Sequence, residues 1–391
     1  MIKKKITLFA SVLLACGSVT CLAGCASSYD ETLTIYNWED YIYEGTDDEG
    51  NQVEDGTIKA FEKYYLEKTG KKLHVDYQTF STNEDMKKQI ELGAVKADLI
   101  CPSDYMIQKM ANDGLLEPFS YDQKTDKYQE SLSNWDQYGS PFIRERFANE
   151  KLKDGSSFLT YAVPYFWGTM GFTYDPTYFS AEEVGTWEAL WNTDAKYAKQ
   201  FSLKDSMRDT YVTAIFHVYK DEIVKGTYHA NLAWSGDAVF AMDNAEESKK
   251  TLCYALPSEG SNVWFDGWCM PKGAQKELAE EFVNFICAPE NAVLNMEAVG
   301  YTSPIVGTDI WEYVNDTYAA EETETDTYTV DLGFYFGQSI EGEATIDIPT
   351  SEKGRQFDAQ YPDEASLKRC CMMKDFGSQQ AKVEQMWQRI K

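Results

Sequence analysis

Residues 33–38 read Leu-Thr-Ile-Tyr-Asn-Trp, an alternation of apolar and polar side chains that predicts a β-strand. Downstream, Ile58, Phe61 and Tyr65 recur at helical spacing, and Gly70 stands where such a helix would end. A strand followed by an amphipathic helix is the first half of a strand–helix–strand unit. The elements that come next therefore determine the class of fold.

The second and third strands are predicted at residues 72–77 (Lys-Leu-His-Val-Asp-Tyr) and 98–101 (Asp-Leu-Ile-Cys). Between them, Thr82 or Asn83 is placed to cap a helix that runs to Gly93. Strands that alternate with helices across short connections predict an α/β fold with a parallel sheet.

Ligands of such sheets bind at the carboxyl ends of the strands. Trp38 ends the first predicted strand, and Ser103 follows the third. We therefore expect both residues to face a ligand site.

A second α/β unit is predicted to open with a short helix over 186–191, after a strand over 169–174. The other expected elements are a strand over 231–237 that enters a tight turn, an amphipathic helix over 277–286, a strand over 330–336 inside an acidic insertion, and a last helix over 376–390. The sequence contains no internal repeat and no glycine-rich nucleotide-binding loop.

The composition is that of a soluble globular protein, with 391 residues of which 43% are hydrophobic and 26% charged. This length is long for one compact core and sufficient for two lobes. The net charge of −28 argues against nucleic-acid binding, which needs Lys and Arg to neutralise phosphates. An acidic surface suits a cationic ligand, because it raises the local cation concentration.

Residues 1–24 have the features of a secretory signal peptide, with lysines at 3–5, a short apolar run and small residues before Cys25. The Leu-Ala-Gly-Cys sequence that ends at Cys25 resembles a bacterial lipobox. That resemblance implies cleavage before Cys25, a diacylglycerol on its thiol, and a membrane tether over residues 25–32. The alternatives are an uncleaved anchor and a signal in which the cysteine is coincidental.

The other cysteines and the histidines predict neither a metal site nor a cofactor. No cysteine has a C-x-x-C spacing or a nearby histidine that would suit a metal. Cys101 and Cys287 lie in apolar runs and are predicted to be buried thiols. His74, His217 and His229 lie in contexts typical of structural histidines.

An aromatic residue close to a carboxylate recurs where strands are predicted to end. The instances are Trp38-Glu-Asp-Tyr41, Ser103-Asp-Tyr105, Trp234-Ser-Gly-Asp237 and Trp264-Phe-Asp266. Aromatic faces attract ammonium groups by roughly 0.5–2 kcal/mol, and carboxylates accept the N–H donors of a protonated amine. The pattern predicts a site for an alkyl chain with positive ends, although a core aromatic beside a surface acid would give each instance alone.

Several longer phrases resemble one protein family. They are residues 35–41 (IYNWEDY), 101–105 (CPSDY), 163–168 (VPYFWG), 187–191 (WEALW), 205–209 (DSMRD), 263–266 (VWFD), 285–291 (FICAPEN) and 300–304 (GYTSP). The phrases occur in the same order in the spermidine/putrescine-binding proteins, the solute receptors of bacterial ABC importers, and the chain resembles this family. A weaker match lies near 361–390.

The resemblance implies an α/β, two-lobed periplasmic-binding-protein fold of type II, a clamshell with strands that cross at the hinge. Lobe 1 would comprise residues 29–168 and 266–308. Lobe 2 would comprise residues 169–265 and 309–391, with 309–360 partly an insertion.

The resemblance also implies which residues bind the ligand. They are Trp38, Asp40, Tyr41, Ser103, Tyr105, Asp209, Trp234, Asp237, Trp264, Asp266 and Tyr301. Asp209 would hold one ammonium end, and Asp237 and Asp266 would hold the other. A salt bridge with Arg208 is the structural alternative for Asp209.

The residues that would determine which amine is preferred resemble two different types of family member. Asp40 and Asp237 resemble the putrescine-preferring type, and Ser206 and Met373 replace an acid and a glutamine of a spermidine-preferring member. Tyr105 and Trp264 resemble the spermidine type. We expect putrescine preference or mixed specificity.

The expected protein is a monomeric, non-catalytic, lipid-anchored receptor in the periplasmic space or on the outer face of the cell membrane. It would deliver putrescine or spermidine to an ABC permease and its ATPase. One alternative is a receptor for an amino acid or a sugar, for which Arg208 is the positive anchor in the cleft motifs. Another is a secreted glycosidase with Asp237 and Asp266 as paired carboxylates.

Overall fold

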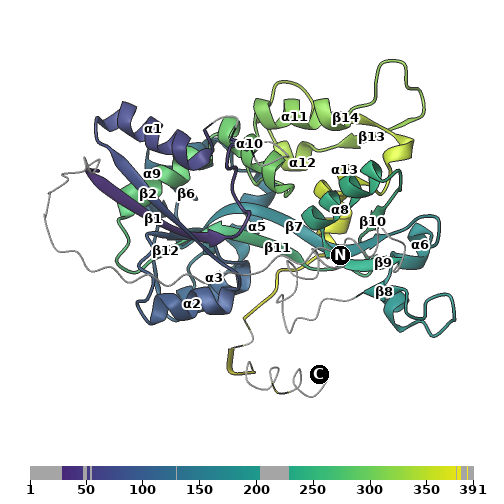
Figure 1. Cartoon of the computed structure of the whole chain (residues 1–391), viewed down its shortest axis with the longest axis horizontal. Coiled ribbons are helices and arrows are strands. Elements are labelled where there is room, and N and C mark those ends of the chain that lie inside the picture. The colour runs from purple at the N-terminus through teal and green to yellow at the C-terminus, as the bar shows by residue number, and fades with distance from the viewer. Residues whose placement is uncertain are drawn as a thin grey trace, which may run out of the picture.

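The computed structural model describes residues 29–46, 51–52, 55–128, 130–202, 229–375, 377–379 and 385. Figure 1 shows two groups of helices and strands, between which run the long strand β7 (Val163–Tyr174) and strand β11 (Val263–Trp268). The fold is mixed α/β, as the alternation of strands and helices predicts. Within the described ranges, no helix is long and apolar enough to cross a membrane.

The first group is built on a parallel sheet in the order β2-β1-β3. Strand β1 (Glu31–Trp38) pairs with β2 (Leu73–Phe80) along its whole length and with β3 (Leu99–Ile100) on its other side. The three strands predicted in this region are therefore confirmed. Because β1 is central, Trp38 lies in the middle of the carboxyl edge of the sheet.

The helices of this group follow local sequence signals. In α1 (Thr57–Thr69), Phe61 and Tyr65 are buried, and Gly70 ends the helix with φ +74°, a conformation that glycine adopts without penalty. Helix α2 (Asn83–Glu91) begins after Thr82, whose hydroxyl accepts the Asp85 N–H at 3.0 Å. Helix α3 (Asp104–Asn112) starts directly after Ser103.

Strand β7 carries the chain from one group to the other. Its first half pairs antiparallel with β11, and its second half pairs with β9 (Ala230–Trp234) and β10 (Cys253–Ala255). Strand β8 (Phe201–Ser202) joins β9 in parallel. Every residue of β7 except Met170 is buried, as expected for a strand that is covered on both faces.

Shorter strands and further helices complete the described fold. They are β4 (Leu116–Glu117), β5 (Tyr121–Asp122), β6 (Lys127–Tyr128), α4 (Ser133–Tyr138), α5 (Pro141–Asn149), α6 (Ala181–Val184), α8 (Ser235–Glu247), β12 (Met270–Pro271), α9 (Lys276–Ile286), α10 (Pro289–Val299), α11 (Thr308–Tyr318), β13 (Thr327–Asp331), α12 (Gly333–Phe336), β14 (Thr345–Pro349), α13 (Gln356–Gln360) and α14 (Glu364–Arg369). Helix α9 confirms the amphipathic helix predicted over 277–286.

Some predicted elements were wrong in type. Strand β13 ends at Asp331, because Asp331 Oδ1 accepts the Gly333 N–H at 2.7 Å and the chain continues as helix α12. Residues 235–237 begin α8 in place of a tight turn, whereas the short helix expected over 186–191 is present as a 3₁₀ helix over 187–191. The last helix predicted over 376–390 lies almost wholly outside the described residues.

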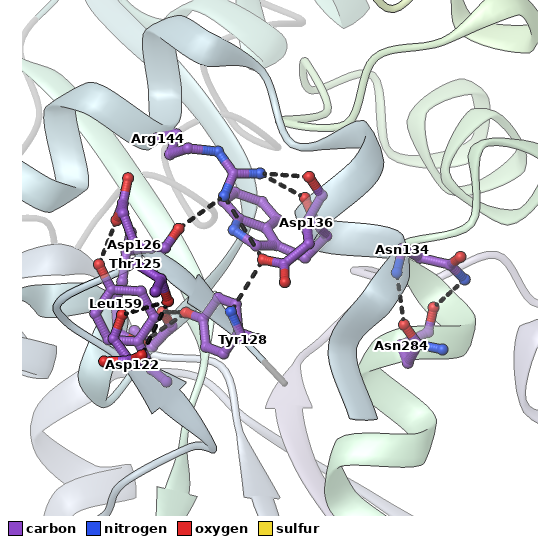
Figure 2. A network of polar contacts seen from close by, with 12 residues as sticks. Asp122, Thr125, Asp126, Tyr128, Asn134, Asp136, Arg144, Leu159 and Asn284 are labelled. Carbon is purple, nitrogen blue, oxygen red and sulfur yellow. Dashed lines mark hydrogen bonds and ion pairs between the residues drawn. The ribbon is translucent and has the colours of Figure 1, made fainter. Parts of the chain in front are cut away.

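A polar network fixes the segment that leads into β7 (Figure 2). Arg144 of α5 donates to the carbonyl oxygens of Trp135 and Asp136, at 2.8 and 3.2 Å. Asp136 Oδ1 accepts the Tyr128 N–H at 3.0 Å, and the Tyr128 hydroxyl donates to the Leu159 carbonyl at 2.7 Å. These bonds hold together segments that precede β7 in the chain.

The cysteines of the described part are unpaired thiols, and all of them except Cys371 are buried. Cys101 and Cys287 are therefore buried as predicted.

Candidate functional site

The carboxyl end of β1 supplies the first part of the site. Trp38 is half-buried and packs on Phe80 of β2, with ring centroids 4.5 Å apart. The chain then turns at Asp40, an exposed residue whose φ of +51° lies in the left-handed region that aspartate tolerates better than most residues. After this turn Tyr41 returns to the interior, where it is 7% exposed.

Tyr41 contacts a buried carboxylate. Its hydroxyl donates to Asp266 Oδ2 at 2.7 Å. Asp266 lies on β11 at a bulge before Gly267 and is 6% exposed. Burial raises the pKa of Asp266 to about 6, although hydrogen bonds from Tyr41 and Ser103 act to lower it. The second oxygen, Oδ1, is buried and accepts no bond of normal hydrogen-bond geometry from the described residues.

Ser103 lies beside Asp266 at the start of α3, and the two residues form a backbone bridge. The Asn83 side chain donates to the hydroxyl oxygens of Ser103 and Tyr105, at 3.1 Å in both cases. The buried Tyr105 hydroxyl donates in turn to Glu84 Oε1 at 3.2 Å. Both partners of the Tyr105 hydroxyl, Asn83 and Glu84, belong to helix α2.

A second tyrosine–carboxylate pair lies where α8 begins. The Tyr301 hydroxyl donates to Asp237 Oδ1 at 2.6 Å. The pKa of Tyr301 is well above its usual range, first because the phenol is buried and then because Asp237 is charged. Gly236 permits this contact, since a Cβ at that position would lie 1.8 Å from the Tyr301 ring.

Aromatic rings connect the two pairs. Trp264 of β11 meets Tyr301 edge to face with centroids 4.9 Å apart, and it meets Trp234 of β9 at 5.8 Å. Tyr301 lies 5.9 Å from Tyr41. We call the set the carboxylate–aromatic site, which comprises Tyr41, Trp234, Asp237, Trp264, Asp266 and Tyr301.

The chemistry of this site favours an organic cation. A buried carboxylate is costly unless a positive charge or enough hydrogen-bond donors compensate it. Among the residues that the structure describes, no lysine, arginine or histidine acts on the pKa of Asp266, whose charge the two hydroxyl groups compensate only in part. A protonated amine would supply both charge and N–H donors, while the rings would pack against its methylenes.

A metal ion is a poorer fit to the described part of the chain. Its histidine, cysteine, aspartate and glutamate side chains form no group of three that could hold a metal ion.

The structure brings most of the predicted ligand residues together. Those that share contacts are Tyr41, Ser103, Trp234, Asp237, Trp264, Asp266 and Tyr301. Trp38 instead contacts β2, Tyr105 contacts α2, and Asp40 is exposed at the turn. Asp209, Arg208, Ser206 and the lipidation candidate Cys25 lie outside the described residues.

Sequence reasoning missed three residues of the site. Phe166 of β7 packs against Tyr41 at 5.3 Å and belongs to the phrase at 163–168, which was the available signal. Gly236 lies between Trp234 and Asp237, where the close packing of Tyr301 requires it. Asn83 was expected only as a helix cap, and nothing in the sequence indicates that its side chain reaches Ser103.

Comparisons with known proteins bear on the family of the chain. Residues 57–222 and 216–308 match the family described as bacterial extracellular solute-binding protein. The putrescine-binding periplasmic protein SpuD of Pseudomonas aeruginosa is 26% identical over 381 residues, which cover 85% of this chain and 91% of that protein.

Solved structures share the fold. The spermidine/putrescine ABC transporter substrate-binding protein PotD from Streptococcus pneumoniae aligns with a TM-score of 0.59 and 23% identity, over 92% of this chain and 99% of that one. The Tp0655 lipoprotein of Treponema pallidum aligns with a TM-score of 0.60 and 20% identity, over the same shares of 92% and 99%.

Proposed function

The chain belongs to the bacterial extracellular solute-binding protein family, and from this premise we propose that it is a polyamine receptor that delivers putrescine or spermidine to an ABC permease and its ATPase. The family consists of non-catalytic receptors, so the glycosidase alternative with Asp237 and Asp266 as paired carboxylates is wrong. The chain is thus a solute-binding receptor of an ABC importer, and the identity of its solute is the proposal.

One observation carries the choice of solute. Asp266 is a buried carboxylate that receives one phenol bond on Oδ2 and leaves Oδ1 without a hydrogen bond of normal geometry in the described part of the chain. An ammonium group placed against Oδ1 would supply the missing donor and the missing charge. The similar proteins include a putrescine-binding and a spermidine/putrescine-binding protein, which supports this class of ligand.

The two carboxylates fit a ligand with more than one positive charge. Asp266 accepts the bond of Tyr41 and Asp237 that of Tyr301, and the two tyrosine rings are neighbours, with Trp264 packed against Tyr301. Both carboxylates would hold one ammonium end of the amine, and its methylenes would lie along the rings. In this arrangement Asp209 would serve the opposite end of the ligand, with Asp40 and Trp38 at the rim.

We divide the chain into the lobes that the resemblance implies, 29–168 with 266–308 and 169–265 with 309–391. Strands β7 and β11 run between the two groups of elements and support this division. A type II clamshell of this kind would close on the amine, because only the closed form lets both lobes touch it.

A lipid anchor at Cys25 belongs to the same proposal. It rests on the lipobox-like sequence at 22–25 and on the similarity in fold to the Tp0655 lipoprotein of Treponema pallidum. The receptor would act as a monomer tethered to the extracytoplasmic face of a bacterial membrane.

Titration calorimetry of residues 27–391 with putrescine and spermidine tests the function. We expect saturable one-to-one binding in the wild type. The Asp266→Asn variant should bind roughly 30-fold more weakly or worse, because truncating one partner of a buried charge pair costs about 2–5 kcal/mol.

The matched control is Asp136→Asn, which makes the same change at a carboxylate of the network in Figure 2. This control should bind the amine within about threefold of the wild type, since Asp136 bonds to Tyr128 and not to a site residue. Equal affinities of Asp266→Asn and wild type, or no binding of either amine by folded protein, would overturn the proposal.

A further inference from the structure

One buried amide lies behind the carboxylate–aromatic site. Asn295 of α10 is 1% exposed. Its Oδ1 accepts the backbone N–H of Tyr43 at 2.9 Å and the Thr57 hydroxyl at 3.2 Å, and its Nδ2 donates to the Asn291 carbonyl at 2.7 Å. The side chain therefore joins α10 to the first residue of α1 and to the loop that follows Tyr41.

A third donor connects Asn295 to Tyr41 itself. The Tyr165 hydroxyl, on β7, lies 3.1 Å from the Tyr41 carbonyl and 3.2 Å from Asn295 Oδ1, so these two acceptors share its single proton. The Asn37 side chain donates to the same Tyr41 carbonyl at 3.3 Å. The backbone is thus held at the carbonyl of residue 41 and at the N–H of residue 43.

This anchoring determines where the Tyr41 phenol lies. The preceding residue, Asp40, has a left-handed φ of +51°, so the local chain is a turn and not part of a regular ladder. Bonds from outside the turn hold the backbone of Tyr41, and neighbouring rings pack against its side chain, which donates to Asp266 at 2.7 Å.

The same helix also carries the other site tyrosine. Helix α10 ends at Gly300, whose N–H donates to the Met296 carbonyl at 2.8 Å, and Tyr301 follows directly. Because Asn295 ties this helix to the Tyr41 loop, it also sets the position of Tyr301 against Tyr41, whose rings lie 5.9 Å apart.

We propose that Asn295 is a positioning residue of the ligand site, which acts through Tyr41 and touches no ligand; this inference rests on the proposed polyamine-binding function. An asparagine suits the task because it accepts and donates at once without charge. Alanine at this position would remove the acceptor of the part-buried Tyr43 N–H and that of the Thr57 hydroxyl, and so release the turn.

A double-mutant cycle tests the route through Tyr41. Asn295→Ala should weaken putrescine binding about tenfold, because the Tyr41 phenol would no longer be held in its binding position before the ligand arrives. In a Tyr41→Phe background, which lacks the phenol bond to Asp266, the same substitution should weaken binding by no more than about twofold. A purely structural role would give the same loss in both backgrounds, and that result would overturn the proposal.

The matched control is Asn284→Ala on α9. Asn284 Oδ1 accepts the backbone N–H of Asn134 at 2.9 Å, so it also receives a main-chain donor, but it joins α9 to α4 (Figure 2). Its loss should leave the affinity within about twofold of the wild type. If Asn295→Ala does not fold, Tyr165→Phe removes the hydroxyl shared with Tyr41 and should show the same dependence on the Tyr41 background.

Hydrogen exchange without ligand separates this inference from the proposed function. Asn295→Ala should lose protection at the Tyr43 N–H while core amides of β7 keep theirs. A wild type that binds no amine would refute the function and leave this exchange result standing. Unchanged protection at Tyr43, or unchanged affinity in folded Asn295→Ala, would refute the role of Asn295.

Discussion

Asp266 holds a carboxyl group in a place where its charge is poorly solvated, and under the proposed function this arrangement would serve binding at the expense of stability. Burial raises the pKa of Asp266 from 3.8 to about 6. A carboxyl group whose pKa is higher in the folded protein than in the unfolded chain stabilises the fold fully at pH values below its pKa in the unfolded chain. This stabilisation is lost as the pH rises through its pKa in the folded protein.

The first prediction is that Asp266→Asn stabilises the ligand-free protein at pH 8. The asparagine retains an acceptor for the Tyr41 hydroxyl and removes the buried charge, so the free energy of unfolding should rise by about 1–3 kcal/mol. Urea unfolding at pH 8 measures this gain, and the gain should vanish at pH 4, where the wild-type carboxyl is protonated in the folded state. A variant less stable than the wild type at pH 8 would contradict the prediction.

Binding should depend on the same titration. The amine stays protonated from pH 5 to 8, whereas Asp266 gains its proton as the pH falls through about 6. We expect putrescine affinity to be constant above pH 7 and to fall by up to about tenfold per unit below pH 6. Titrations at pH 5, 6 and 8 measure this, and equal affinities at all three would exclude Asp266 as the ammonium partner.

Gly236 provides a test of packing in the site. Alanine within a helix normally stabilises it by roughly 0.5–1 kcal/mol relative to glycine. Here a Cβ would lie 1.8 Å from the Tyr301 ring, so Gly236→Ala should displace Tyr301 from Asp237 and weaken putrescine binding at least about tenfold. The control is Glu247→Ala, at the other end of α8, which should bind putrescine like the wild type. If Gly236→Ala also binds putrescine like the wild type, the contact with Tyr301 has no role in binding.

The sequence predicts residue types at the site better than it predicts their partners. Tyr41, Asp237, Asp266 and Tyr301 stand in phrases that identify them. Their pairing across 225 and 64 residues of chain depends on tertiary structure and on the turn at Asp40. Nothing in the sequence indicates the bonds that Asn295 makes, because a single asparagine in a helix forms no local pattern.

Among the elements, α12 and the hairpin of β13 and β14 were expected to form part of an insertion. Tyr335 of α12 is instead fully buried at the centre of several contacts. Trp167 of β7 donates its indole N–H to the Tyr335 hydroxyl at 2.9 Å, and that hydroxyl donates to the Ser303 carbonyl. The Ser140 hydroxyl donates to the Tyr335 carbonyl at 2.7 Å.

Tyr335→Phe should therefore destabilise the protein by about 2–4 kcal/mol, because it leaves the Trp167 N–H and the Ser303 carbonyl buried without a partner. Thermal unfolding measures the loss. Tyr328→Phe is the matched control, since its half-buried hydroxyl bonds only to Asp358 in the described part, at 3.3 Å, and it should cost less than about 1 kcal/mol. Equal stabilities of Tyr335→Phe and the wild type would show that α12 is a surface addition.

Elements in the first group were predictable because each has a local cause. Alternation marks β1, the spacing of Phe61 and Tyr65 marks α1, and Gly70 ends it. Residues 330–336 were mistaken for a strand because aromatic residues favour strands in general. The Asp331 side chain, which caps the turn at Gly333, overrides that preference.

On the scale of the whole molecule, β7 and β11 are the connection between the two groups of elements. Asp266 and Trp264 lie on β11, and Phe166 lies opposite Asp266 on β7. Ligand contacts on the connecting strands would couple binding to the relative position of the groups.

Saturating putrescine should therefore reduce the radius of gyration measured by small-angle X-ray scattering, as the lobes close on the amine. Asp266→Asn should show no change at the same concentration, because it would not be saturated. A wild-type scattering profile that is identical with and without bound putrescine would contradict closure.

The central claim is that the buried carboxylates receive the ammonium groups of a polyamine. The most direct measurement is a calorimetric titration of residues 27–391 with putrescine, beside its uncharged analogue 1,4-butanediol, which has the same four methylenes. We predict saturable one-to-one binding of putrescine and no detectable binding of the diol. Binding of both compounds with similar affinity, or of neither by folded protein, would contradict the claim.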